Sequence, residues 1–279
     1  MSNEYAGHII ESHYQKLEAY SNKIAEDFDT DSIHHFRVEY KKLRAFLRMV
    51  TEEDVQPKMP KKLKKFYHIA GDIRDLQLYN LLVKNSFKEL KTKPKEYRHL
   101  LEREIKKLEK KLLRNVKKSP PEDLVSHEVH LRPKFTQRDF LDFLAINQTR
   151  IEQVIAFRRY SDEDIHNIRK CLKDIFYNKK AYDQEDSESS PVTIFNGKTE
   201  EYLHGLLEEL GNFQDKRNAI LLMQKKGAAD INLIERELLL NLGQKWLKEK
   251  KNMRTHLIEK LETELSPNNA GRATLLLNK

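Results

Sequence analysis

The chain has 279 residues, of which 34% are charged and 38% hydrophobic, so it is long enough for one large helical domain or two smaller lobes with a real core. Lysine and arginine exceed aspartate and glutamate by 52 − 44 = 8, which permits binding to a polyanion. The single cysteine, Cys171, excludes an internal disulfide and a cysteine-rich metal cluster. No apolar run approaches the roughly 20 residues of a membrane span, and the N-terminus has no signal-peptide pattern. These features predict a cytoplasmic protein that does not enter membranes.

Apolar residues recur at helical intervals along most of the chain. They predict helices at 4–27, 31–50, 58–90 and 94–117, then a proline-containing connector at 119–135. Four further helices are predicted at 136–158, 161–180, 199–225 and 230–264, with an acidic loop near 183–190 and a tail at 266–279. We therefore expect an all-α fold of two four-helix bundles, the first at 4–118 and the second at 136–265.

The two sets of four helices share a sequence pattern, which indicates an internal duplication. "IHHFRVEYKKLR" and "IHNIRKCLKDIF" align at an offset of 165 − 33 = 132 residues, with Ile, His, Arg and Lys in common. Each copy is followed by a glycine and, four residues later, an aspartate: Gly71 with Asp75, and Gly211 with Asp215. Because the aspartates recur at one helical position, we expect Asp75 and Asp215 to be buried structural partners of neighbouring basic side chains.

The second predicted helix carries a row of cations on one face. At 100° per residue the row occupies a sector of about 80° and extends over roughly 21 Å; its members are His34, Arg37, Lys41, Arg44 and Arg48. Phe36 and Leu43 occupy the neighbouring sector, so the row should border the buried side of the helix. Like charges three or four residues apart cost a few tenths of a kcal/mol each. A bound polyanion would offset this repulsion; a solvated helix surface is the alternative.

The sixth predicted helix repeats this row less fully. His166, Arg169 and Lys173 lie in line, with Lys170 beside them. "SDED" at 161–164 predicts a capping box, which places His166 near a helix N-terminus whose unpaired N–H groups favour an anion. Asp174 and Phe176 stand where the first copy has Lys42 and Arg44, so we expect weaker binding by the second copy.

Two other predicted helices are rich in lysine. On the third, Lys58, Lys61, Lys65 and His68 repeat the angular offsets of the first row, so Lys61 and Lys65 are further candidates for anion binding. On the fourth, "REIKKLEKKLLRNVKK", the acids Glu102, Glu104 and Glu109 are interleaved with the lysines. We interpret that helix as an ordinary solvated surface.

The two histidine-containing segments, each followed by a Gly-x-x-x-Asp helix, resemble the signature copies of the conserved histidine α-helical domain, or CHAD, family over about residues 5–265. The resemblance implies a single domain of two four-helix bundles, related by a pseudo-twofold axis, whose basic residues converge on a central groove. It implies that the chain binds inorganic polyphosphate without enzymatic activity, and that it associates with polyphosphate granules and their proteins. The residues carried over by position are His34, Arg37, Lys41, Lys42 and Arg44 in the first copy, and His166, Arg169, Lys170 and Lys173 in the second.

Many members of that family carry an N-terminal triphosphate tunnel domain, whereas this chain begins directly with the helical part, so we expect no catalytic module, cofactor or metal. Polyphosphate has no bases and therefore needs no aromatic stacking platforms. The basic rows are expected to lack interleaved aromatic rings, because Phe36, Tyr40 and Phe46 fall on other sides of their helix, and nucleic acid should then be only a weak competitor. At ordinary pKa values near 6.5, His34 and His166 would bind a polyanion better as the pH falls.

Two alternatives belong to other functional classes. A phosphate-processing enzyme, such as a polyphosphatase, would need metal-binding carboxylates or a nucleophile near the basic rows, and Asp72, Asp75 and Asp215 are the only candidates in the repeated motifs. A general scaffold for nucleic acid or acidic partners would show the same basic surface and the same steep dependence on salt. Competition between polyphosphate and nucleic acid, and assay of released orthophosphate, would separate the three.

Overall fold

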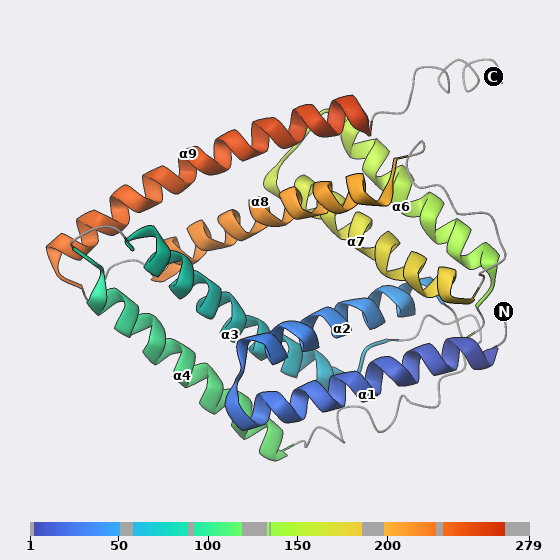
Figure 1. Ribbon diagram of the computed structural model, residues 1–279, viewed down its shortest axis with the longest axis horizontal. Coiled ribbons are helices and arrows are strands. Elements are labelled where there is room, and N and C mark those ends of the chain that lie inside the picture. Colours follow the sequence, from blue (N-terminus) through green and yellow to red (C-terminus); the bar gives the residue numbers. More distant parts are fainter. Residues whose placement is uncertain are drawn as a thin grey trace. The chain divides into compact units, whose positions relative to one another are not determined.

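The computed structural model describes residues 3–50, 58–88, 92–118, 133, 135–185, 198–226 and 231–265. All regular secondary structure among these residues is α-helical (Figure 1), which confirms the predicted fold class. The helices are α1 (Asn3–Asp27), α2 (Thr30–Met49), α3 (Lys61–Ser86), α4 (Lys95–Lys118), α6 (Gln137–Phe157), α7 (Asp162–Glu185), α8 (Glu200–Lys226) and α9 (Leu233–Glu264).

The predicted helix boundaries differ most at α3 and α7. Helix α3 begins at Lys61, after Pro60, and ends at Ser86, so Lys58 precedes the helix instead of forming its first turn. Helix α7 continues to Glu185, beyond the predicted end at 180. The beginning of the predicted acidic loop is therefore helical. Its remainder, most of the connector at 119–135 and the tail at 266–279 lie outside the described residues.

Short polar motifs set the helix starts. The carboxylate of Asp29 accepts a hydrogen bond from the backbone N of Ser32 at 2.7 Å and caps α2. At the start of α7, Ser161 Oγ accepts from the backbone N of Asp164 at 3.1 Å, and the Asp164 carboxylate accepts from the backbone N of Ser161 at 2.8 Å. The capping box predicted from "SDED" is therefore confirmed. Thr136 and Asp139 make the same reciprocal pair at α6.

The chain forms two compact units that do not coincide with the two predicted repeats. The first comprises Met1–Asp139 and Ala219–Gln244, and the second Phe140–Asn218 and Lys245–Lys279. The three boundaries between the units all fall within the second predicted repeat and inside helices, one each in α6, α8 and α9. The end of α8 and the beginning of α9 therefore belong with α1 to α4.

In the first unit, α2 packs against α1 and α3, and α3 packs against α4. The rings of Phe36 and Phe66 lie 4.8 Å apart in this core. The buried carboxylate of Glu235, near the start of α9, accepts hydrogen bonds from the backbone N atoms of Glu96 (3.0 Å) and Tyr97 (2.9 Å). These N–H groups lie in the first turn of α4 and have no partner within the helix, which explains why the start of α9 belongs to this unit.

In the second unit, buried aromatic rings and ion pairs join the helices. Phe140 of α6 stacks on Tyr182 of α7, with ring centroids 4.6 Å apart. Lys216 of α8 pairs with Glu249 of α9 at 2.7 Å and lies 5.3 Å from the ring centroid of the buried Trp246. No helix in the described part of the chain combines the length and apolarity needed to cross a membrane.

Candidate anion-binding site

The basic row of α2 lies at the edge of the buried side of its helix, as its spacing predicts. Phe36, Leu43 and Leu47 are buried. His34 is exposed, and the other cations of the row are half-buried, namely Arg37, Lys41, Arg44 and Arg48. Water and salt screen half-buried charges less than fully exposed ones, so an anion that reaches this row interacts with it more strongly.

Arg37 is held between α2 and α3 by three contacts. Its guanidinium lies over the ring of Tyr67, with Cζ 5.1 Å from the ring centroid, and Nη2 lies 3.8 Å from Oδ1 of Asp75. It also lies directly against Gly71, where a Cβ atom would stand 1.8 Å from Nη1. Glycine is therefore required at position 71 for close approach of a side chain. Tyr67, Gly71 and Asp75 follow one another at intervals of four residues, which places all three on one face of α3.

Asp75 attracts Arg37 but lies too far away for a hydrogen bond, since 3.8 Å exceeds the range of about 2.7–3.2 Å. Its side chain is 41% exposed, and Asp215 is also exposed. The expectation that both aspartates are buried is therefore wrong. An exposed acid beside a cation is screened by water, so Asp75 neutralises Arg37 less than a buried carboxylate would.

Two stacked tyrosines lie between Arg37 and Arg44, so the expectation that aromatic rings avoid the basic row is wrong. The rings of Tyr40 and Tyr67 are 3.9 Å apart at 16°. Cζ of Arg44 lies 6.0 Å from the Tyr40 ring, which completes an Arg–Tyr–Tyr–Arg series. Burial raises the pKa of Tyr40 to about 12, against the effect of Arg44. The angular position of Tyr40 on α2 does not reveal the ring of Tyr67, which α3 brings beside it.

Lys42 lies on another side of α2, about 80° from His34 in projection. Its Nζ donates to Oε1 of Glu39 at 2.6 Å, and Nδ1 of His13 is 2.8 Å from Oε2 of the same carboxylate. Glu39 is buried, so this cluster ties α1 to α2. The structure thus brings Arg37 and Arg44 together, while Lys42 is engaged with a carboxylate.

Glu39→Gln is expected to lower the free energy of unfolding mainly above pH 4.5. Burial raises the pKa of Glu39, but hydrogen bonds from His13 and Lys42 outweigh it and lower the pKa from 4.5 to about 2. The ionised form therefore stabilises the fold above the unfolded-state pKa. This contribution, on the order of 3 kcal/mol, is lost as the pH falls from about 4.5 to about 2.

Urea unfolding of the wild type and of Glu39→Gln between pH 2 and 7 measures this effect. The difference in unfolding free energy should shrink towards low pH. A difference that stays constant across the range would show that the Glu39 charge contributes nothing to stability.

The α3 candidates Lys61 and Lys65 are both exposed, as are Lys62 and Lys64. Because α3 starts at Lys61, the predicted row on this helix loses Lys58 as a helical member. The apolar residues between and beside these lysines, Leu63 and Phe66, are buried, so the lysines lie on the solvent side of α3. Of the two predicted cation rows in the first unit, only that of α2 is partly shielded from water.

In the second unit, His166, Arg169 and Lys173 are half-buried on α7, and Lys170 is exposed. Arg169 faces Gly211 as Arg37 faces Gly71, but less closely: a Cβ atom on Gly211 would be 3.5 Å from Nη2, an ordinary contact. Phe176, which replaces Arg44, packs against His204 with ring centroids 4.7 Å apart. The second row is therefore built on the same plan with fewer cations and looser positioning.

Burial changes the protonation of two residues in this row. It lowers the pKa of His166, although Glu163 acts in the opposite direction, so the expectation of an ordinary histidine pKa is wrong at this position. Burial also lowers the pKa of Lys173 to about 8; the charge of Arg169 adds to this effect and that of Asp215 opposes it. Lys173 is thus a cation whose charge changes just above neutral pH, and Asp215 acts on it electrostatically.

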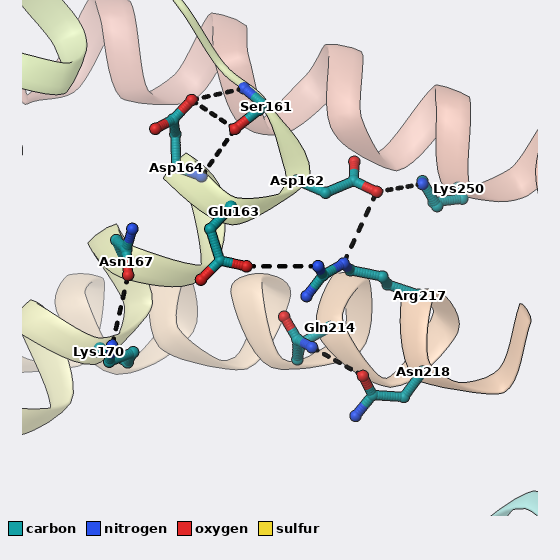
Figure 2. Close-up of polar contacts among 10 residues, drawn as sticks. All are labelled: Ser161, Asp162, Glu163, Asp164, Asn167, Lys170, Gln214, Arg217, Asn218 and Lys250. Carbon is teal, nitrogen blue, oxygen red and sulfur yellow. Dashed lines mark hydrogen bonds and ion pairs between the residues drawn. The ribbon is translucent and has the colours of Figure 1, made fainter. Parts of the chain in front are cut away.

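The N-terminus of α7 already holds carboxylates of the protein itself (Figure 2). The Asp164 carboxylate accepts the capping hydrogen bonds, and Asp162 pairs with Lys250. Arg217 lies 3.8 Å from Asp162 and 3.4 Å from Glu163. The negative charges of Asp162, Glu163 and Asp164 at this helix end disfavour the external anion that the sequence predicted there. Sequence reasoning missed Arg217 and Lys250, whose partners lie far away in the sequence.

The geometry provides positioned cations and no cluster of three histidine, cysteine or acidic side chains suited to a metal among the described residues. Half-buried guanidinium groups can bind oxyanions through paired N–H donors. The fold and the site define a class of protein. Its members are all-helical and contain a duplicated helix that carries such a row of cations in each copy.

The chain belongs to the CHAD domain family, since the family model matches residues 8–220. Among solved structures, it is similar to PptA from Streptomyces chartreusis, with a TM-score of 0.69 and 12% identity over 93% of this chain and 98% of that one. It is also similar to the crystal structure of the CHAD domain from the plant Ricinus communis, with a TM-score of 0.59 and 15% identity over 100% of this chain and 93% of that one. At these identities the likeness shows a shared fold. No curated protein matches the sequence.

Proposed function

We propose that this protein binds inorganic polyphosphate, without catalysing its chemistry, through the cation rows of α2 and α7. The observation that carries the proposal is an unsatisfied donor in each row. Within the described residues, the buried Nε atoms of Arg44 and Arg169 have no hydrogen-bond partner. A buried donor without a partner costs about 1–3 kcal/mol, and an oxyanion that draws these guanidinium groups into contact with it would remove that cost.

The positioning of Arg37 supports the same proposal. A guanidinium already fixed by Gly71, Tyr67 and Asp75 loses little conformational entropy when an anion binds. Most long cations lose substantially more when they are immobilised. The row of α2 is accordingly proposed as the stronger site and that of α7 as the weaker one.

Polyphosphate is favoured over single-stranded nucleic acid because the aromatic rings near the row are not free platforms. Tyr40 is buried, and Tyr67 has one face against Tyr40 and the Arg37 guanidinium beside it. A base would have to displace one of these partners in order to stack. A chain of phosphates needs only the N–H and ammonium donors. Association with polyphosphate granules follows from this ligand.

The deciding experiment is a titration with long-chain polyphosphate at physiological salt, with single-stranded and duplex DNA as competitors. We expect binding that DNA at the same phosphate concentration does not displace. Equal displacement by DNA would favour the general scaffold instead. Release of orthophosphate on addition of magnesium would favour a phosphate-processing enzyme.

Polyphosphate binding is expected to take up protons at pH 8–9 because of Lys173. With a pKa of about 8, this amine is partly neutral in that range, and a nearby polyanion favours its protonated form. Calorimetry in two buffers of different ionisation enthalpy measures the uptake. Lys173→Met should remove it, whereas Lys170→Met, at an exposed neighbour on the same helix, should not. Equal proton uptake by all three proteins would exclude Lys173 from the site.

A further inference from the structure

The solvent side of α4 carries a dense array of cations that is separate from the row of α2. Tyr97, Leu101, Ile105 and Leu112 are buried and define the inner side of this helix. At 100° per residue, the cations fall within an arc of about 140° on the opposite side and extend over roughly 22 Å. All are exposed, and together they form the basic face of α4: Arg103, Lys106, Lys107, Lys110, Lys111, Arg114, Lys117 and Lys118.

The acids of α4, which the sequence pattern indicates as partners of its lysines, form an ion pair with only one cation of this face among the described residues. Glu102 pairs with Arg98 at 3.4 Å and with His99 at 3.3 Å, and neither belongs to the basic face. Glu104 divides its carboxylate between Lys107 at 2.7 Å and Lys226 of α8 at 3.1 Å. Glu104 thereby joins α4 to α8, while both of these partners of Glu102 lie within α4.

Glu109 lies about 60° outside the arc of the basic face in projection along the helix. Burial raises its pKa, and the charge of Lys106 acts against this effect. Apart from Lys106 and Lys107, the cations of the basic face have no carboxylate partner among the described residues. These are Arg103, Lys110, Lys111, Arg114, Lys117 and Lys118.

The spacing of the face makes this array costly for the free helix. Most of its cations have another cation three or four residues further along, and each such like-charge pair destabilises the helix. A bound polyanion reverses the sign of this contribution. The face presents about one positive charge per 3 Å of helix axis, a density that suits a chain with one negative charge on each unit.

The chemistry of the face distinguishes between polyanions. Helices that adsorb to membranes insert apolar side chains, whereas the apolar side chains of α4 are buried or half-buried in the protein. Readers of single-stranded nucleic acid offer exposed aromatic rings, whereas the aromatic residue of α4, Tyr97, is buried. We infer that the basic face of α4 is a second polyphosphate-binding surface, independent of the row of α2, an inference that rests on the proposed function for its ligand.

The test uses a double variant, Lys110→Glu with Arg114→Glu, and compares it with a control double variant that changes the net charge by the same amount. The control is Lys16→Glu with Lys23→Glu, at exposed positions of α1 in the same unit. Calorimetry with polyphosphate of about ten phosphates should show one bound chain fewer per protein for the α4 variant than for the control. With long chains, the affinity should fall about three- to tenfold. Lys110→Gln with Arg114→Gln should show a smaller loss, and circular dichroism should show unchanged helicity.

Each outcome has a distinct meaning. If the α4 variant and the control bind equally, while substitutions at Arg37 and Arg44 abolish binding, the α4 inference fails and the proposed function stands. If the wild type does not bind polyphosphate at all, the proposed function fails, and so does the assignment of polyphosphate to the basic face of α4. If the α4 variant loses binding only to DNA, or only to vesicles containing phosphatidylserine, the face serves a different partner and the assignment to polyphosphate is overturned.

Discussion

Gly71→Ala is expected to weaken polyphosphate binding about ten- to hundredfold while leaving the protein folded. The new Cβ atom would stand 1.8 Å from Nη1 of Arg37, so the guanidinium must leave its position beside Tyr67 and Asp75. A flexible side chain moves at little cost to the fold, and alanine favours the helix by roughly 0.5–1 kcal/mol over glycine. Loss of a charge-assisted hydrogen bond costs about 1.5–3 kcal/mol, which corresponds to the stated loss of affinity.

Gly211→Ala is the matched control, because the same change in the second repeat meets Arg169 only at 3.5 Å. It should retain the wild-type affinity and gain stability from the higher helix propensity of alanine. Titration calorimetry and urea unfolding of both variants measure the two effects. Equal loss of affinity in both variants would mean that the close approach at position 71 has no special role.

A double-mutant cycle separates positioning from general disturbance of α3. If Gly71 acts through Arg37, Gly71→Ala should cost little affinity in an Arg37→Lys background, where no guanidinium remains to be displaced. Additive losses would indicate that alanine acts elsewhere. The chemical shift of the Arg37 side-chain Nε, measured by nuclear magnetic resonance without ligand, should change in Gly71→Ala and gives a readout that does not depend on the proposed ligand.

Arg37→Glu combined with Arg44→Glu should weaken polyphosphate binding at least a hundredfold at physiological salt. The double substitution removes both cations of the Arg–Tyr–Tyr–Arg series and places two carboxylates in the row. It also reduces the number of phosphate contacts, so the affinity should depend less steeply on salt than in the wild type. Fluorescence titration at several salt concentrations measures both quantities.

The control must exclude a simple effect of net charge. Lys16→Glu with Lys23→Glu makes the same change, from +8 to 8 − 4 = +4, at exposed sites on α1. Affinity in this control should stay within about threefold of the wild type. If both double variants bind equally well, the row of α2 is not the site. Circular dichroism distinguishes a lost site from a lost fold.

The two repeats have diverged in how firmly they hold their shared arginine. Arg37 lies against Tyr67 and directly on Gly71, whereas Arg169 has only an ordinary distance to Gly211. The position that corresponds to Arg44 is Phe176 in the second repeat, and its ring packs against His204. Two of the cations in the second unit, Arg217 and Lys250, are engaged by the acids at the start of α7. The sequence difference at 174 and 176 pointed to a weaker second copy, and the contacts supply further physical reasons for it.

The sequence by itself determined the helices, their order and the half-buried position of the cation row. These follow from periodicity and capping, in which the interacting residues lie within a few positions of one another, as Ser161 and Asp164 do. The capping box and the burial of Phe36 and Leu43 beside the row were therefore predictable. The position of Gly71 and Asp75 on one face of α3 was also predictable, because two residues four positions apart lie on the same side of a helix.

Only the tertiary structure decided which of these groups meet. Tyr67 stacks on Tyr40, His13 contacts Glu39, and Glu235 caps α4, and in each of these contacts the partners lie on different helices. Burial likewise set the pKa values of His166 and Lys173. Periodicity specifies which side of a helix faces inwards, but not the rotation and register at which two helices pack. For that reason the protonation states and the neighbours of each arginine had to come from the packed structure.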